Sequence, residues 1–178
     1  MIRPEFRGEL FGQQKKLARI WLAFAEAILI FLAMPYLFPP VLHPEYAPET
    51  VRTGLWLVSV VDIAVLAWWN RRYLGTQSIL SQASTNRRIK PPPGLSQPIS
   101  PLEEGAVKVV SWFWTAKLVA FAFAESLALY GLALAVVGGY FLDQYILSFV
   151  SGLLLAYQFP TAESFEVILR EYEGRAGA

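Results

Sequence analysis

The sequence contains no cysteine and a single histidine, and these shortages exclude several kinds of functional site. Without cysteine the chain has no disulfides, no thiolate metal ligands and no cysteine nucleophile. One histidine, His43, cannot supply a multi-histidine metal or haem site. No nucleophile–base pair or metal-ligand cluster is visible in the sequence. We therefore predict no catalytic residues, no metal site and no cofactor, and hence a protein that is not an enzyme.

Charged residues are also scarce, at 16% of the chain, and they nearly cancel to a net charge of +1. Nucleic-acid binding needs a concentrated basic surface, so we expect no nucleic-acid partner. Apolar residues are abundant instead, at 55% of the chain. The mean hydropathy is +0.41, and soluble domains have about 45–50% apolar residues. This composition predicts an integral membrane protein whose first partner is the lipid bilayer.

The apolar residues concentrate in four segments that are long enough to cross a bilayer, given that a helical span needs about 20 residues. The first is too long for a cleaved signal peptide, and it contains Glu26. We predict an all-α fold, with residues 1–178 forming a single membrane domain built on a bundle of four transmembrane helices. The predicted spans cover residues 17–38, 53–69, 118–137 and 142–159.

Lysine and arginine are distributed unevenly among the segments that connect these spans. The stretches before the first span and between the second and third are rich in them, whereas Arg52 alone lies between the first two spans. Basic loops stay on the cytoplasmic side of a membrane. The pattern therefore predicts that both termini are cytoplasmic. The basic residues on that side are Arg3, Arg7, Lys15, Lys16, Arg19, Arg71, Arg72, Arg87, Arg88, Lys90 and Lys108.

The segments outside the spans carry signals of their own. Residues 1–16 predict an amphipathic helix at the membrane interface, with Phe6, Leu10 and Leu17 as its apolar stripe. Residues 76–100 predict a cytoplasmic linker, whose three consecutive prolines favour an extended spacer over a docking segment for a partner. The outer loop around His43 is rich in proline, which predicts a stiff surface loop.

Two helices, one of which contains the third predicted span, have a clear start in the sequence. Ser100 and Glu103 enclose a proline in a capping box, so a helix begins there. It is expected to end at Gly138-Gly139 and to exceed the bilayer thickness, because about 37 residues span ~55 Å. After Pro160 an apolar stripe at helical spacing predicts a short amphipathic C-terminal helix. The residues of this stripe are Phe165, Ile168, Leu169 and Tyr172.

Three carboxylates lie inside the predicted spans: Glu26, Asp62 and Glu125. Each is about eight or nine residues, or ~13 Å, from an end of its span, which places all three near the midplane. Ionisable groups at this depth are costly and are candidate proton or cation sites. The alternative is that they are protonated and hydrogen-bond to neighbouring helices. A glutamate–aspartate pair also leaves an intramembrane enzyme open as a third interpretation. Lys117 and Asp143 lie near span ends, where we expect snorkelling.

Two sequence patterns suggest how the helices are organised. Ala23-Phe24-Ala25-Glu26 recurs as Ala122-Phe123-Ala124-Glu125, which fits either a duplicated two-helix hairpin or chance. Small residues also recur every four positions in the third span, which favours close helix packing within the monomer over a dimer interface. These helix-packing residues are Ala116, Ala120, Ala124 and Ala128.

The run from Glu125 to Leu132, with the sequence ESLALYGL, resembles the second helix of the rotary ATP synthase c subunit. The resemblance implies that Glu125 is a proton- or sodium-binding carboxylate and that Tyr130 supplies a nearby hydroxyl. The glycine ladder of that family's first helix is absent, so ring assembly is not implied. The whole chain resembles small four-span bacterial membrane proteins with a c-subunit-like third segment. That likeness implies a multi-pass protein of the bacterial inner membrane.

These features predict a non-enzymatic membrane protein that serves as an accessory or assembly subunit of a larger complex. Its partners would be other membrane-protein subunits, with a homo-oligomer as the alternative. The alternative function is proton or cation handling by Glu26, Asp62 and Glu125, with Tyr130.

Overall fold

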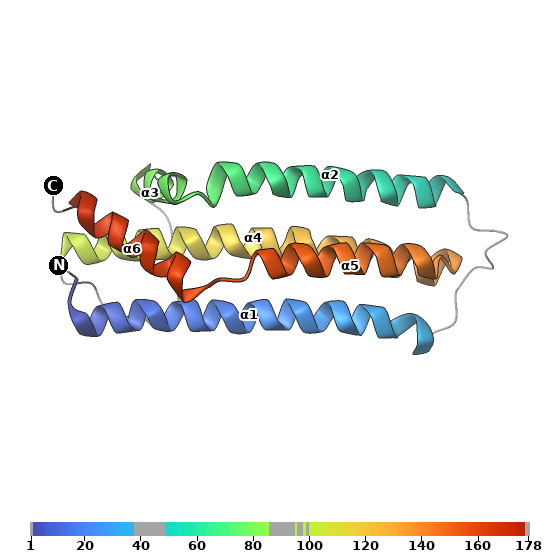
Figure 1. Ribbon diagram of the computed structural model, residues 1–178, viewed down its shortest axis with the longest axis horizontal. Coiled ribbons are helices and arrows are strands. Elements are labelled where there is room, and N and C mark those ends of the chain that lie inside the picture. The colour runs from blue at the N-terminus through green and yellow to red at the C-terminus, as the bar shows by residue number, and fades with distance from the viewer. Residues whose placement is uncertain (1, 38–48, 86–94, 96–97, 99, 177–178) are drawn as a thin grey trace. The chain divides into compact units, whose positions relative to one another are not determined.

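The computed structural model describes residues 2–37, 49–85, 95, 98 and 100–176, and all of the secondary structure within them is helical (Figure 1). The described residues contain no β-strand, as the all-α prediction requires. The elements in chain order are α1 (Pro4–Leu37), α2 (Glu49–Tyr73), α3 (Thr76–Thr85), α4 (Pro101–Gly138), α5 (Phe141–Tyr157) and α6 (Ala162–Ala176).

Three of these helices, α1, α2 and α4, are long and apolar enough to cross a membrane. The pair α5 and α6 passes the same test only as one unit, bent by 43° at its break. The all-α prediction is therefore confirmed, and three or four helices are candidate membrane spans by their length and composition. The outer loop around His43 and most of the proline linker lie outside the described residues.

Two segments differ from the prediction. The N-terminal residues do not form a separate interfacial helix, because α1 continues without a break from Pro4 to Leu37. The first ten residues of the predicted linker form α3, where Ile79, Leu80 and Ala83 are buried. Three apolar residues at helical spacing stabilise this short helix despite its polar composition.

The chain divides into two compact units, each built from segments that are far apart in the sequence. Unit 1 comprises Met1–Ile20, Trp69–Val119 and Phe159–Ala178, and unit 2 comprises Trp21–Trp68 and Ala120–Gln158. The long helices α1, α2 and α4 therefore contribute segments to both units.

Unit 1 has an aromatic core to which the terminal helices contribute. The Phe165 ring on α6 lies 5.5 Å from the Phe11 ring and 5.7 Å from the Phe113 ring, both edge-on. Phe6 and Leu10 of α1 are also fully buried. The apolar stripe that predicted an interfacial helix therefore packs against protein in this unit.

The start of α4 is fixed by a side-chain cap, as the capping box predicted. The Glu103 amide donates to Ser100 Oγ at 3.2 Å, which satisfies one of the free N–H groups at the helix start. The Glu103 carboxylate is buried and accepts two hydrogen bonds from the Arg3 guanidinium, at 2.7 and 3.0 Å. Such a two-bond pair is geometrically specific, and here it joins α4 to the N-terminus of the chain.

A glycine allows α6 to approach α4 in unit 1. The Tyr172 hydroxyl donates to the Leu102 carbonyl at 3.0 Å. A Cβ atom on Gly105 would lie 1.8 Å from that hydroxyl oxygen, so any other residue at this position displaces the phenol ring. Burial raises the pKa of Tyr172 further above neutral, so the hydroxyl remains protonated and able to donate.

Among the helices that could each span a membrane alone, α4 is the most buried. In its most apolar window, 44% of the residues are buried, against 11% in those of α1 and α2. The alanines at four-residue spacing are fully buried within the chain, at positions Ala116, Ala120, Ala124 and Ala128. Small side chains at this spacing let neighbouring helices approach α4 closely.

Candidate functional site

Asp62 on α2 accepts two hydrogen bonds from hydroxyl groups of α4. Ser126 Oγ lies 2.8 Å and Tyr130 Oη 2.9 Å from the same carboxylate oxygen, Oδ2. Ser126 and Tyr130 are four residues apart and so share one face of α4. The Asp62 side chain is half-buried. All three residues belong to unit 2.

This arrangement can hold a proton or a small cation. A carboxylate surrounded by apolar helices is costly unless donors or a bound cation compensate its charge. The two hydroxyls provide donors to the charged form, and hydroxyl oxygens can also serve as acceptors. Hydrogen bonds between helices contribute about 1 kcal/mol each in a membrane. The hydrogen bonds of Asp62 with Ser126 and Tyr130 therefore also stabilise the contact between α2 and α4.

The hydroxyl of Tyr130 donates a hydrogen bond to Asp62 and not to Glu125. The c-subunit resemblance implies the opposite pairing, with Glu125. The geometry of a helix explains the difference. Residues five apart are rotated by roughly 140° around the axis at 3.6 residues per turn, so these two side chains leave α4 in different directions. Glu125 is half-buried and makes no hydrogen bond or ion pair with the described residues.

Glu26 lies on the exposed surface of α1, in the middle of its apolar segment. It makes no hydrogen bond or ion pair within the described part of the chain. Its neighbours one turn away are also exposed: Leu22 at 50%, Leu29 at 66% and Ile30 at 58%. The helix therefore presents a carboxyl group in the centre of an otherwise apolar outward face.

The three predicted carboxylates thus have three different environments in unit 2. Asp62 is bonded to hydroxyls, Glu125 is half-buried without a partner among the described residues, and Glu26 faces outward. In the same part of the chain, no group of three or more histidine, cysteine or acidic side chains could hold a metal ion.

The ion pair between Arg52 and Asp143 was not predicted from the sequence. The guanidinium lies 2.5 Å and 3.0 Å from the two carboxylate oxygens. Arg52 also lies 5.0 Å above the Tyr140 ring. Asp143 is only 3% exposed, so an ion pair explains this residue better than the predicted snorkelling. The one signal in the sequence was that Arg52 is the single basic residue between the first two predicted spans.

A second feature that sequence analysis missed is the polar inner face of α5. Gln144, Ser148 and Ser151 are at most 2% exposed and follow one another at intervals of four and three residues. Residues at these intervals share one helix face. Ser151 Oγ donates to the Ala124 carbonyl of α4 at 2.6 Å. This polar row was visible in the sequence, but serines and glutamines are common enough in helices that its burial was not predictable.

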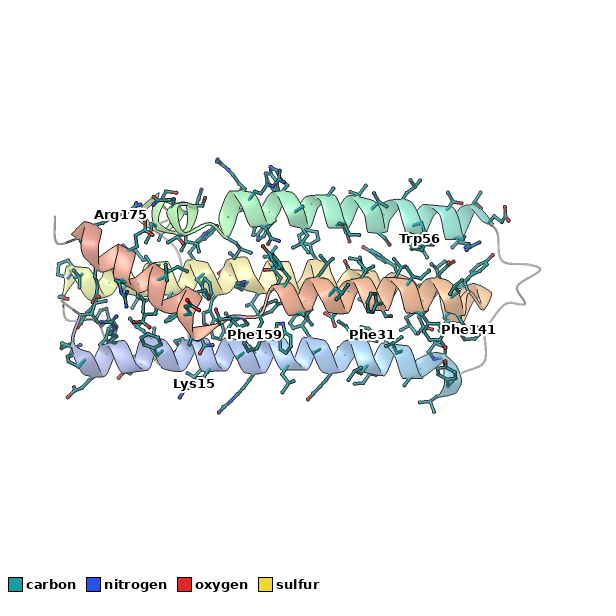
Figure 2. All side chains as sticks on the ribbon, viewed as in Figure 1. Lys15, Phe31, Trp56, Phe141, Phe159 and Arg175 are labelled. Atoms are coloured by element: carbon teal, nitrogen blue, oxygen red, sulfur yellow. The ribbon has the colours of Figure 1, made fainter. Side chains whose placement is uncertain are left out.

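The Gln144 side chain replaces a backbone donor that is missing in α1. Proline has no amide hydrogen, so Pro35 leaves the carbonyl of Phe31, four residues earlier, without its helical partner. Gln144 Nε2 donates to that carbonyl at 2.7 Å. Phe31 is labelled on α1 in Figure 2. The side chain of Gln144 therefore has a fixed orientation, with its amide nitrogen toward α1.

No protein-family model, curated protein or solved structure matches this sequence.

Proposed function

We propose that this chain is a non-enzymatic accessory or assembly subunit of a larger membrane complex, and that the outward face of α1 binds a helix of another subunit. The exposed position of Glu26 carries this proposal. Three neighbouring apolar residues on the same face suit contact with lipid or with a second helix, but a carboxyl group among them does not suit lipid alone.

An ionised carboxyl group at Glu26 would be costly within hydrocarbon. An ionised aspartate at the centre of a spanning helix costs about 2.5–3.5 kcal/mol on translocon-based scales, and we take Glu26 to be comparable. Within the described residues Glu26 has no internal donor that would offset this cost. A partner helix with a hydrogen-bond donor at the same depth would offset part of it, because interhelical hydrogen bonds contribute about 1–2 kcal/mol at most.

The finer topology belongs to the same proposal. The chain would form a bundle of four transmembrane helices in the bacterial inner membrane, with both termini in the cytoplasm, since the basic loops favour that side. The recurrence of Ala-Phe-Ala-Glu at Glu26 and Glu125 favours a duplicated two-helix hairpin. The burial of Glu125 and the exposure of Glu26 would then reflect different packing of the two copies.

Site-directed cross-linking in native membranes tests the proposed face. The chain has no cysteine, so a single introduced cysteine is a unique attachment point. We expect a cross-linker on Leu29→Cys, one turn from Glu26, to capture one membrane protein in fixed yield. Leu153→Cys on α5 is the control, because Leu153 has a similar exposed fraction, 56% against 66%.

The capture should also depend on the carboxyl group. Glu26→Leu should abolish the Leu29→Cys product, whereas Glu26→Gln, which can still hydrogen-bond, should retain part of it. Equal capture from Leu29→Cys and Leu153→Cys, or capture that is unchanged in Glu26→Leu, would contradict the proposal.

Proton or cation handling is the second candidate function, and the two hydroxyl contacts of Asp62 favour it. In liposomes under a pH or sodium gradient, the purified protein should then carry a flux above that of empty liposomes. Asp62→Asn should abolish the flux. Glu125→Gln tests the role that the c-subunit resemblance implies for the other half-buried acid. No flux from the wild-type protein would rule this function out.

A further inference from the structure

Two buried oxygen atoms on the inner face of α5 lack a protein partner. Gln144 Oε1 and Ser148 Oγ are inaccessible to solvent, and neither has a hydrogen-bond partner among the described residues. Gln144 is 0% exposed and Ser148 is 2% exposed. Leaving a buried polar group unsatisfied costs about 1–3 kcal/mol, and native proteins satisfy the large majority of such groups.

The nitrogen and oxygen of the Gln144 side-chain amide cannot be exchanged. Its nitrogen must face the Phe31 carbonyl, because that oxygen can only accept a hydrogen bond. Exchanging the nitrogen and oxygen of the amide would place two acceptors against each other. The unpartnered atom is therefore the acceptor Oε1, and the missing partner is a donor.

Gln144 and Ser148 are one turn apart on the same face of α5. Residues four apart on a helix have Cβ atoms about 5–6 Å apart. One small molecule between two side chains that leave the helix a turn apart can reach both of them with hydrogen bonds of about 2.8 Å. The bridging group must donate to Oε1, and it must donate to or accept from the Ser148 hydroxyl.

The local charge favours a neutral bridge. Asp143, the nearest carboxylate in the sequence, is already paired with Arg52 through both of its oxygens. Gln144 and Ser148 are both uncharged, so neither side chain contributes a negative charge that would hold a cation. Buried waters typically make about two to four hydrogen bonds to otherwise unsatisfied polar groups.

We propose that a water molecule is bound inside unit 2 and bridges Gln144 Oε1 to Ser148 Oγ. The water completes the contact that begins with Pro35: the proline frees the Phe31 carbonyl, Gln144 binds that carbonyl, and the water satisfies the rest of the Gln144 amide. This inference is independent of the proposed subunit role, because it concerns the interior of the chain.

Solid-state NMR with magnetisation transfer from water tests the proposal on the full chain in lipid bilayers. We expect transfer to the Gln144 side-chain amide to build up several-fold faster than transfer to the backbone amide of Leu127, which is apolar and 0% exposed. Build-up at Gln144 that is no faster than at Leu127 would overturn the proposal. This comparison uses only the wild-type protein, so it does not depend on the folding of a variant.

The variant Ser148→Ala tests the bridge itself. Removing one of the two water-binding groups should at least halve the transfer to Gln144 and lower Tm. If the Ser148 hydroxyl is instead unsatisfied, its removal deletes an unfavourable buried group, so Tm stays the same or rises and the proposal fails. Ser59→Ala is the matched control, because Ser59 is buried like Ser148 (0% against 2% exposed) but donates to the Leu55 carbonyl of its own helix at 2.7 Å. It should leave transfer to Gln144 unchanged.

Discussion

Replacing Gly131 by alanine should separate α5 from α4. A Cβ atom at this position would lie 3.0 Å from the Gln144 Cα, 3.1 Å from the Gln144 carbonyl oxygen and 3.3 Å from the Leu147 Cβ. The first two are backbone atoms, which cannot rotate away as a side-chain end can. The α5 helix must therefore shift by a few tenths of an ångström to accept the methyl group.

The expected cost follows from two opposing terms. Overpacking a close contact typically costs about 1–3 kcal/mol. Alanine is more favourable than glycine within a helix by about 0.8–1.0 kcal/mol. We therefore expect Gly131→Ala to range from neutral to about 2 kcal/mol destabilising.

Gly152 on α5 provides a matched control, because a Cβ atom there would have no neighbour within 4 Å. Gly152→Ala keeps the gain in helix propensity and lacks the clash. The difference between the two variants therefore isolates the contact and should be about 1–3 kcal/mol.

The assay is reversible unfolding in mixed micelles, followed by circular dichroism, with both alanine variants measured beside the wild-type protein. Equal unfolding free energies for Gly131→Ala and Gly152→Ala would refute the close approach of α5 to α4. So would a Gly131→Ala variant that is more stable than Gly152→Ala.

Two further variants test other contacts. Gly105→Ala should displace the Tyr172 phenol and break its hydrogen bond, which contributes about 0.5–1.5 kcal/mol. Hydrogen exchange of the α6 amides should become faster, by about fivefold for a loss of 1 kcal/mol, and unchanged exchange would contradict this contact. Asp143→Arg should lower Tm because it places two cations together, and adding Arg52→Asp should restore part of the loss. A double variant that is no more stable than Asp143→Arg alone would argue against the ion pair.

The helices were largely predictable because their signals are local. Apolar runs marked the helices that are candidate membrane spans, and Ser100 marked the start of α4 through its cap. The predicted end at Gly138-Gly139 is also correct, since Gly139 has φ 68°, a conformation that glycine adopts readily. Each of these features depends on residues that are close in the sequence.

The contacts between helices were not predictable, because they depend on how each helix is rotated about its axis. The sequence placed Asp62 and Glu125 at similar depths, but depth does not say which of the two acids faces the Tyr130 hydroxyl. The ion pair between Arg52 and Asp143 joins residues 91 positions apart. Pairings over such distances follow from packing of the whole chain, and one sequence carries little information on them.

The mass of the native particle tests the subunit proposal most directly. The protein should be purified from its own membrane in a mild detergent and weighed by native mass spectrometry, together with the Glu26→Leu variant. The proposal predicts a wild-type complex with other membrane proteins at fixed stoichiometry, and its loss in Glu26→Leu. A wild-type chain that purifies as a lone, stable monomer and carries an ion flux would contradict the proposal.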